Sequence, residues 1–134
     1  MVDIKRLIPQ RNPILMVDEL VSVEDNIAST VFVVKSNEFL CEDSHLTEAG
    51  LIEHIAQSAS SFAGYKAIAA GATNPPEGMI GEVKRFTLHR FPLIGEKLET
   101  EVIFGAEIGG VTIVNAKTRV GGEIVAETKL KIAV

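Results

Sequence analysis

The sequence predicts an α+β domain in which a curled antiparallel sheet of about six strands wraps around one long central helix. Two β-like stretches come first, a single long stretch with helical periodicity follows, and four more β-like stretches complete the chain. Strands joined by short turns pair antiparallel, whereas parallel strands need a long crossover between them. We expect residues 1–134 to form one domain of this kind, because a chain of this length can bury its own core.

The first β-like region runs from about Ile14 to Val34. Apolar residues recur along it, and the polar trio Glu24-Asp25-Asn26 interrupts them near the middle. Such a trio is typical of a turn between two strands. The region therefore predicts a β-hairpin.

The long helix is predicted from Thr47 to about Ala70. Its apolar side chains are spaced three and four residues apart along one helical face: Ala49, Ile52, Ile55, Ala56, Ala59, Phe62 and Ala63. At 1.5 Å per residue the helix would be roughly 35 Å long. Its other face also carries few charges, as is typical of a helix inside a domain. The glycine and prolines of residues 71–76 end it.

A sheet can cover only one side of this helix, so we expect a second subunit to cover part of the remaining apolar surface. An edge strand of the sheet would offer unpaired backbone groups through which two sheets can join. The sequence therefore predicts a homodimer or a higher homo-oligomer.

Four strands are predicted after the helix, at residues 79–91, 97–104, 111–120 and 123–134. Turn residues separate them, and the pairs Gly109-Gly110 and Gly121-Gly122 are typical of two-residue hairpin turns. In the last strand apolar and charged residues alternate, which indicates one buried and one solvated face. This pattern favours consecutive antiparallel hairpins.

The charge pattern argues against several classes of partner. The net charge is −5, and no run of basic residues exceeds the two of Lys84-Arg85, so we expect no nucleic-acid partner. The chain has no run of 18 apolar residues and begins without a signal-peptide pattern. We therefore expect a cytoplasmic protein with no membrane partner.

The sequence also lacks patterns for metal, cofactor or cysteine chemistry. Cys41 is the only cysteine, so no intrachain disulfide can form. Its acidic neighbours Glu42 and Asp43 disfavour a reactive thiolate, which argues against a cysteine nucleophile. A glycine-rich phosphate loop and a histidine–cysteine cluster with metal spacing are both missing. We predict no metal and no cofactor.

Three segments resemble the 3-hydroxyacyl-[acyl-carrier-protein] dehydratase family. Residues 8–18 read IPQRNPILMVD, which is similar to the family opening L-P-H-R-x-P-h-L-h-h-D. Residues 52–57 read IEHIAQ, similar to I-E-x-h-A-Q on the family's central helix. Residues 81–98 contain GEVKRF and PLIGEKL, similar to G-x-x-x-x-F and P-x-G-D/E-x-L. The resemblance is greatest to the short relatives of aryl-polyene and polyketide pathways that lack a His-Phe-Pro-Gly motif. It implies a hotdog fold and acyl thioester substrates carried by acyl carrier protein or coenzyme A.

Glu53 is the first candidate catalytic residue. A carboxylate on a helix that is otherwise sealed from water is costly unless it is paired, hydrogen-bonded or protonated, and such a group suits proton transfer. The resemblance matches Glu53 to the acid that acts on the thioester in the family. The alternative is that Glu53 faces a solvated gap, or pairs with Lys66 or an arginine.

His45 is the candidate for a second catalytic group, because the family's acid works with a histidine from a neighbouring loop. His45 lies eight residues before Glu53, and it could reach a site shared between subunits if its loop folds back. The alternative is an exposed loop histidine. His54 is turned by about 100° from Glu53 on the helix, so a shared proton path within one subunit is not expected, although His54 could line a dimer contact. His89 has no motif support.

Gln57 and Gly50 are the candidate substrate-binding residues. Gln57 lies four residues after Glu53 on the same helical face, where its amide could orient the carboxylate or a substrate carbonyl. A helix-surface amide satisfied by backbone groups is the alternative. Gly50 lies in the first helical turn, where the resemblance implies a backbone N–H that points at the thioester carbonyl.

The expected function is dehydration of 3-hydroxyacyl thioesters to 2-enoyl thioesters in fatty-acid or polyketide-type synthesis. Two alternatives remain open. The chain could be a non-catalytic acyl-binding or partner subunit of a synthase complex, because His-Phe-Pro-Gly is missing. It could also be an acyl thioesterase, because related hotdog proteins hydrolyse thioesters with one carboxylate and water.

Overall fold

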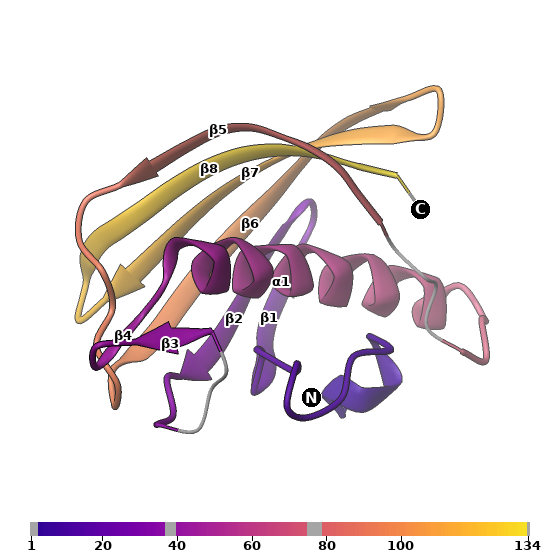
Figure 1. Ribbon diagram of the computed structural model, residues 1–134. Helices are drawn as coiled ribbons and strands as arrows, with labels where there is room; N and C mark the ends of the chain where they lie inside the picture. The colour runs from indigo at the N-terminus through magenta and orange to yellow at the C-terminus, as the bar shows by residue number, and fades with distance from the viewer. Residues whose placement is uncertain (1–2, 37–39, 75–78, 134) are drawn as a thin grey trace.

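The computed structural model describes residues 3–36, 40–74 and 79–133. A 3-10 helix at Ile4–Arg6 comes first. The remaining elements are β1 (Glu19–Glu24), β2 (Ile27–Val33), β3 (Cys41–Glu42), β4 (His45–Leu46), α1 (Glu48–Ala69), β5 (Met79–Leu88), β6 (Lys97–Ile108), β7 (Val111–Val120) and β8 (Glu123–Ala133). Six strands form one antiparallel sheet in the order β1-β2-β6-β7-β8-β5. The sheet curls around α1 (Figure 1), which confirms the predicted fold class.

Glycine pairs set the two hairpins that hold the long strands together. Gly109 and Gly110 have φ values of 62° and 81°, and Gly121 and Gly122 have φ values of 57° and 85°. Two consecutive positive φ angles are the geometry of the hairpin turn that matches strand twist, and glycine adopts it without a steric cost. The sequence prediction of both turns is therefore confirmed.

Three predicted boundaries were wrong. β6 continues to Ile108 rather than ending at residue 104, because a register shift between Phe104 and Glu107 breaks the alternation on which the prediction depended. β5 ends at Leu88, three residues before the predicted end. Residues 14–18 precede β1 instead of forming part of a strand.

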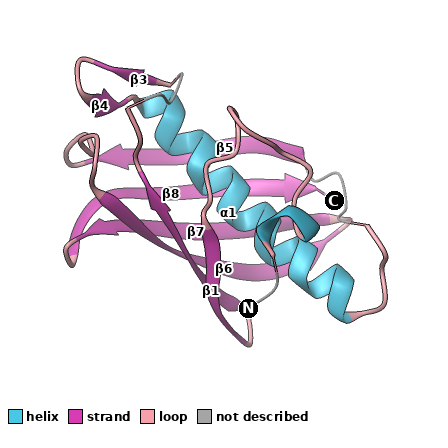
Figure 2. Ribbon diagram, turned by 90° about the horizontal axis from the view of Figure 1, so that it is seen from below, coloured by secondary structure: helices cyan, strands magenta, loops and turns pink. Residues whose placement is uncertain are grey.

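A short hairpin of β3 and β4 lies next to the start of α1, and the sequence prediction missed it (Figure 2). Each of its strands has only two residues, which is too short for an alternating pattern. The backbone N–H of Leu46 donates to the carbonyl of Pro92 at 2.9 Å, so the hairpin is attached to the β5–β6 connection. This attachment fixes the position of His45.

The N-terminal segment, residues 3–18, lies against the side of α1 that faces away from the sheet (Figure 1). Leu7 packs so closely on the helix that a Cβ atom on Gly64 would lie 1.9 Å from the Leu7 carbonyl oxygen. The segment ends at Asp18, whose carboxylate accepts the N–H of Val33 at 2.8 Å. The chain itself therefore covers part of the helix surface that we expected a second subunit to cover. The homo-oligomer stays a prediction.

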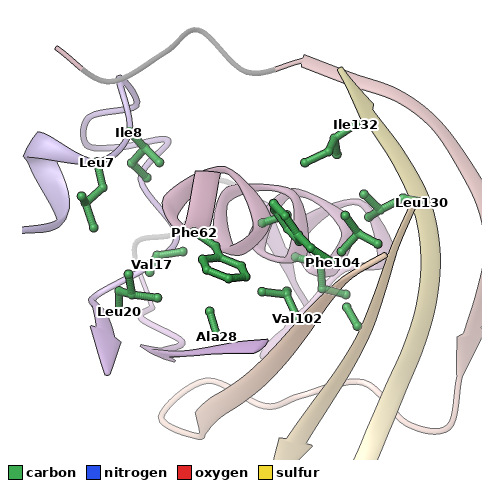
Figure 3. Packing of buried hydrophobic residues seen from close by; sticks show 14 of the residues in the cluster. Leu7, Ile8, Val17, Leu20, Ala28, Phe62, Val102, Phe104, Leu130 and Ile132 are labelled. Atoms are coloured by element: carbon green, nitrogen blue, oxygen red, sulfur yellow. The ribbon is translucent and has the colours of Figure 1, made fainter. Parts of the chain in front are cut away.

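The main core fills the space between the helix, the sheet and this segment (Figure 3). Phe62 of α1 and Phe104 of β6 lie in its centre, with ring centroids 4.6 Å apart. Burial of one such side chain stabilises the fold by about 1.5–3 kcal/mol. Leu7 and Ile8 close the core on the side away from the sheet, as Figure 3 shows.

Three of the buried threonines of the sheet lie side by side on its inner face, and we call them the threonine row: Thr30, Thr100 and Thr118. They are in register across β2, β6 and β7, with Thr30 opposite Thr100 and Thr100 opposite Thr118. The hydroxyl groups of Thr30 and Thr100 bond Ser58 and His54 of α1, and the hydroxyl of Thr118 bonds Thr100. The contact between helix and sheet is therefore partly polar.

Candidate active site

Glu53 lies on the second turn of α1, and its side chain is half-buried. Its Oε2 atom accepts a hydrogen bond from the amide nitrogen of Gln57 at 2.8 Å. Its Oε1 atom has no hydrogen-bond partner among the residues that the structure describes. The carboxylate is thus held by one oxygen while the other stays available to a reactant.

Gln57 is 1% exposed, and its amide group is fully engaged. The amide nitrogen donates to Glu53 and to the carbonyl of Ile14 at 2.8 Å, and the amide oxygen accepts the N–H of Met16 at 2.6 Å. A glutamine amide has only two N–H donors, so no donor remains for a substrate carbonyl. Gln57 therefore orients the Glu53 carboxylate through one N–H group. Its other N–H group and its oxygen bind backbone groups, as the alternative interpretation of this residue expected.

Lys66 does not pair with Glu53. Its ammonium group lies over the rings of Phe62 and Phe104, at 4.8 and 5.3 Å from their centroids. Among the described residues, Glu53 takes part in no ion pair with any lysine or arginine. Within one subunit, the ion-paired alternative for this carboxylate was therefore wrong.

His45 lies in β4, near the start of α1. Its half-buried ring packs on Phe91 with centroids 4.4 Å apart, and its backbone bridges to Leu93. Phe91, Leu93 and Ile94 are apolar but 40%, 52% and 37% exposed. Within the described part of the subunit, no hydrogen bond or ion pair links His45 with Glu53. One subunit therefore does not bring the two candidate catalytic residues into contact.

Gly50 is buried in the first turn of α1, and two interactions define its place. Its N–H donates to the hydroxyl of Thr47 at 3.2 Å, because Thr47 is the N-cap of the helix. A Cβ atom on Gly50 would lie 2.4 Å from a methyl carbon of Leu46. These contacts give Gly50 a capping and packing role, and its role in substrate binding stays a prediction.

His54 points into the domain, where it is fully buried between α1 and the sheet. Its Nδ1 atom lies 2.7 Å from the carbonyl oxygen of Met16, and its Nε2 atom lies 2.7 Å from the hydroxyl of Thr100. Its ring stacks on Phe32 at 5.6 Å. The possibility that His54 lines a dimer contact was therefore wrong, because its direction on the helix faces the chain's own sheet.

The protonation state of His54 follows from these contacts. A carbonyl can only accept, so Nδ1 carries the proton and Nε2 accepts from Thr100. Burial lowers the pKa of His54 from 6.5 to about 4, although the Met16 carbonyl and Asp18 act in the opposite direction. His54 is therefore neutral at pH 7, and it does not work as an acid–base group on the substrate.

Stability should fall as the pH drops from 6.5 to 4. In this range the unfolded state binds a proton on His54 and the folded state does not, so the free energy of unfolding decreases by up to about 3 kcal/mol. Urea titrations at several pH values measure it. The loss should be absent in His54→Asn and retained in His89→Asn. Equal slopes in both variants would contradict the assignment.

Carboxylates contribute in a lower pH range. Hydrogen bonds from Lys84, Arg90 and His89 lower the pKa of Glu82, Glu96 and Glu127, respectively, below 4.5. A lowered folded pKa gives stability that is present above 4.5 and lost below it. The range between 5 and 6.5 therefore reports mainly on His54.

Sequence reasoning missed the backbone groups of Ile14 and Met16 that bind Gln57. It also missed the buried hydrogen bonds of His54 with Met16 and Thr100. The spacing of His54, Ser58 and Ser61 on α1 was the available signal, because polar side chains three and four residues apart share a helical face. All three are buried and hydrogen-bonded.

Five cavities formed by the described residues lie away from Glu53 and His45. One of about 330 Å³ is lined by Ile4, Pro13 and Lys35, among others, and one of about 350 Å³ lies at the β6–β7 hairpin around Ile108. Three smaller cavities also lack Glu53 and His45 in their walls.

Within residues 3–36, 40–74 and 79–133, no three metal-ligating side chains cluster. In the same ranges, no helix has the length and hydropathy to cross a bilayer.

Solved structures with the same architecture include several hotdog proteins. The chain is similar to a structure of the dehydratase heterocomplex ApeI:P from Xenorhabdus doucetiae, with a TM-score of 0.89 and 16% identity over 99% of this chain and 91% of that chain. It is similar to the PaaI protein of E. coli, from the phenylacetic acid degradation operon, with a TM-score of 0.70 and 9% identity over 87% and 82%. A hypothetical thioesterase with coenzyme A from Streptococcus pneumoniae TIGR4 gives 0.68 and 12% over 87% and 86%.

The TM-scores show that the chain shares the hotdog fold of these proteins, as the sequence predicted. At such low identities the likeness extends to the fold alone. Among curated proteins no match was found. A family model described as ApeP-like, ApeP dehydratase, matches residues 2–134. Because this match spans nearly the whole sequence, the chain belongs to the ApeP-like dehydratase family.

Proposed function

We propose that the protein dehydrates 3-hydroxyacyl thioesters to 2-enoyl thioesters in the cytoplasm, with Glu53 as an acid–base group. The observation that carries the proposal is the half-buried Glu53 carboxylate, which Gln57 holds by one oxygen and which has the other oxygen free. Membership in a dehydratase family supports the reaction class. The acyl group would be carried by acyl carrier protein or coenzyme A.

The reaction needs two proton movements. The C2–H bond breaks and gives its proton to a base, the C2=C3 double bond forms, and the C3 hydroxyl leaves as water after it takes up a proton. In our proposal the free oxygen of Glu53 carries one of these protons, and His45 or a water molecule carries the other. A positioned side chain of this kind speeds proton transfer about 10² to 10⁴-fold.

We place the site between two subunits. The described cavities of a single subunit are lined by neither Glu53 nor His45, and the apolar residues Phe91 and Leu93 beside His45 are exposed. Exposed apolar clusters are typical of contact surfaces. A second hotdog subunit at this surface would enclose an acyl pocket and bring its own His45 or an equivalent group toward Glu53. In the proposal the second subunit is another copy of this chain.

The alternative is a partner subunit without its own turnover. It is favoured by the lack of contact between His45 and Glu53 within one subunit, and by the similarity to a structure described as a dehydratase heterocomplex. A thioesterase is the remaining alternative, supported by the similarity to a hypothetical thioesterase with coenzyme A.

One assay separates the three functions. The purified chain is given 3-hydroxyacyl and 2-enoyl thioesters on both carriers, while the enoyl absorbance and the free thiol are followed. We expect interconversion of the two thioesters without thiol release. Thiol release would support the thioesterase, and activity only after addition of a second hotdog subunit would support the partner role.

A further inference from the structure

We propose that His54 is a positioning residue, which holds Glu53 in place through the backbone of Met16. The proposal rests on the proposed function in one respect, because it assigns the acid–base role to Glu53. Its geometry stands on hydrogen bonds that no substrate is needed to form.

Residues 14–16 are fastened to α1 by two side chains that lie three residues apart. Gln57 binds the carbonyl of Ile14 and the N–H of Met16, at 2.8 and 2.6 Å. His54 binds the carbonyl of the same Met16 at 2.7 Å. Met16 is 0% exposed, so water cannot replace either of its backbone partners.

The network around His54 has one consistent direction. Because the Met16 carbonyl takes the Nδ1 proton, Nε2 must accept the hydroxyl proton of Thr100. The Thr100 oxygen then accepts from the hydroxyl of Thr118 at 2.8 Å. Each group is satisfied, and the ring is further confined by Phe32. His54 therefore presents a fixed N–H donor to Met16.

The effect reaches Glu53 through Gln57. The amide nitrogen of Gln57 is shared between the Ile14 carbonyl and Glu53, and its amide oxygen depends on Met16. If the Met16 carbonyl loses its donor, residues 14–16 move and the Gln57 amide turns with them. The carboxylate of Glu53 then loses its orientation, and a displacement of about 1 Å can cost on the order of a hundredfold in rate.

Two substitutions at His54 separate this role from simple packing. In His54→Asn the amide nitrogen replaces Nδ1, so the donor to Met16 is restored while the contact with Thr100 is lost. In His54→Gln the amide group replaces Nε2, so the contact with Thr100 is kept and the donor to Met16 is lost. Both variants remove the ring, and asparagine leaves the larger void, so a loss of packing alone would affect His54→Asn more than His54→Gln.

The primary measurement is the NMR signal of the Gln57 side-chain amide. We expect His54→Gln to shift this signal and to speed its hydrogen exchange at least about tenfold, whereas His54→Asn keeps it close to wild type. In turnover assays, His54→Gln should lower kcat at least about tenfold with KM nearly unchanged, and His54→Asn should restore most of kcat.

The proposal is overturned if His54→Gln leaves the Gln57 signal unchanged, or if both His54 variants shift it equally. The ring nitrogens of His54 in the wild-type protein give a test that needs no variant: a proton on Nε2 in place of Nδ1 would also overturn it. If the wild-type chain shows no turnover, the proposed function fails, while the Gln57 signal still decides the role of His54.

Discussion

Glu53→Gln is expected to lower kcat for hydration of a 2-enoyl thioester by at least about a hundredfold, because an amide cannot exchange the proton that a carboxylate does. The substituted side chain has the same shape, and its amide oxygen can still accept the hydrogen bond from Gln57. We therefore expect little change in KM or in thermal stability. The disappearance of the enoyl absorbance measures the rate.

A matched control is available on the same helix. Glu48 lies in the first turn of α1 and is exposed, so Glu48→Gln makes the same change of charge nearby without touching Gln57. We expect its kcat to stay within about threefold of wild type, since exposed substitutions of this kind have small effects. Full activity of Glu53→Gln would show that this carboxylate is not the acid–base group.

Gly64→Ala should destabilise the protein by about 3 kcal/mol or more, although alanine normally stabilises a helix by about 1 kcal/mol relative to glycine. The added Cβ would lie 1.9 Å from the carbonyl oxygen and 2.8 Å from the carbonyl carbon of Leu7. These are backbone atoms, so the whole N-terminal segment must move away from the helix. A thermal melt should show a decrease on the order of 10 °C.

Ser60→Ala is the control for this substitution. Ser60 lies one turn before Gly64 on α1 and is half-buried, so the variant tests helix propensity without a clash. We expect the melting temperature to change by no more than about 2 °C. If Gly64→Ala melts at the same temperature as Ser60→Ala, then residues 3–18 do not pack against the helix as described.

Patterns between neighbouring residues predicted the helix and the turns well. The helix was expected from Thr47 to about Ala70 and runs from Glu48 to Ala69, because its spacing and the glycine after it are local signals. The glycine pairs located both hairpins for the same reason. The neighbourhood of Glu53 and Gln57 was also predictable, since residues four apart on a helix are adjacent.

The rest of the candidate site depends on contacts that the sequence does not encode locally. The partners of Gln57 are backbone groups of residues 14 and 16, and a backbone group has no residue-type signal. The position of His45 depends on the attachment of the short β3–β4 hairpin to the β5–β6 connection. In the proposed function a second subunit brings His45 toward Glu53, and the pattern of one chain does not specify such a contact.

The threonine row limits how the central helix can slide. A helix that slides by one turn moves about 5.4 Å along its axis, and apolar contacts alone carry no directional hydrogen bonds that mark its position. A shift of this helix would separate His54 from Thr100 and Ser58 from Thr30. Each buried polar group that loses its hydrogen-bond partner would lower the stability of the fold by about 1–3 kcal/mol. These hydrogen bonds therefore favour a single position of the helix along the sheet, and with it a single position of the Glu53 carboxylate.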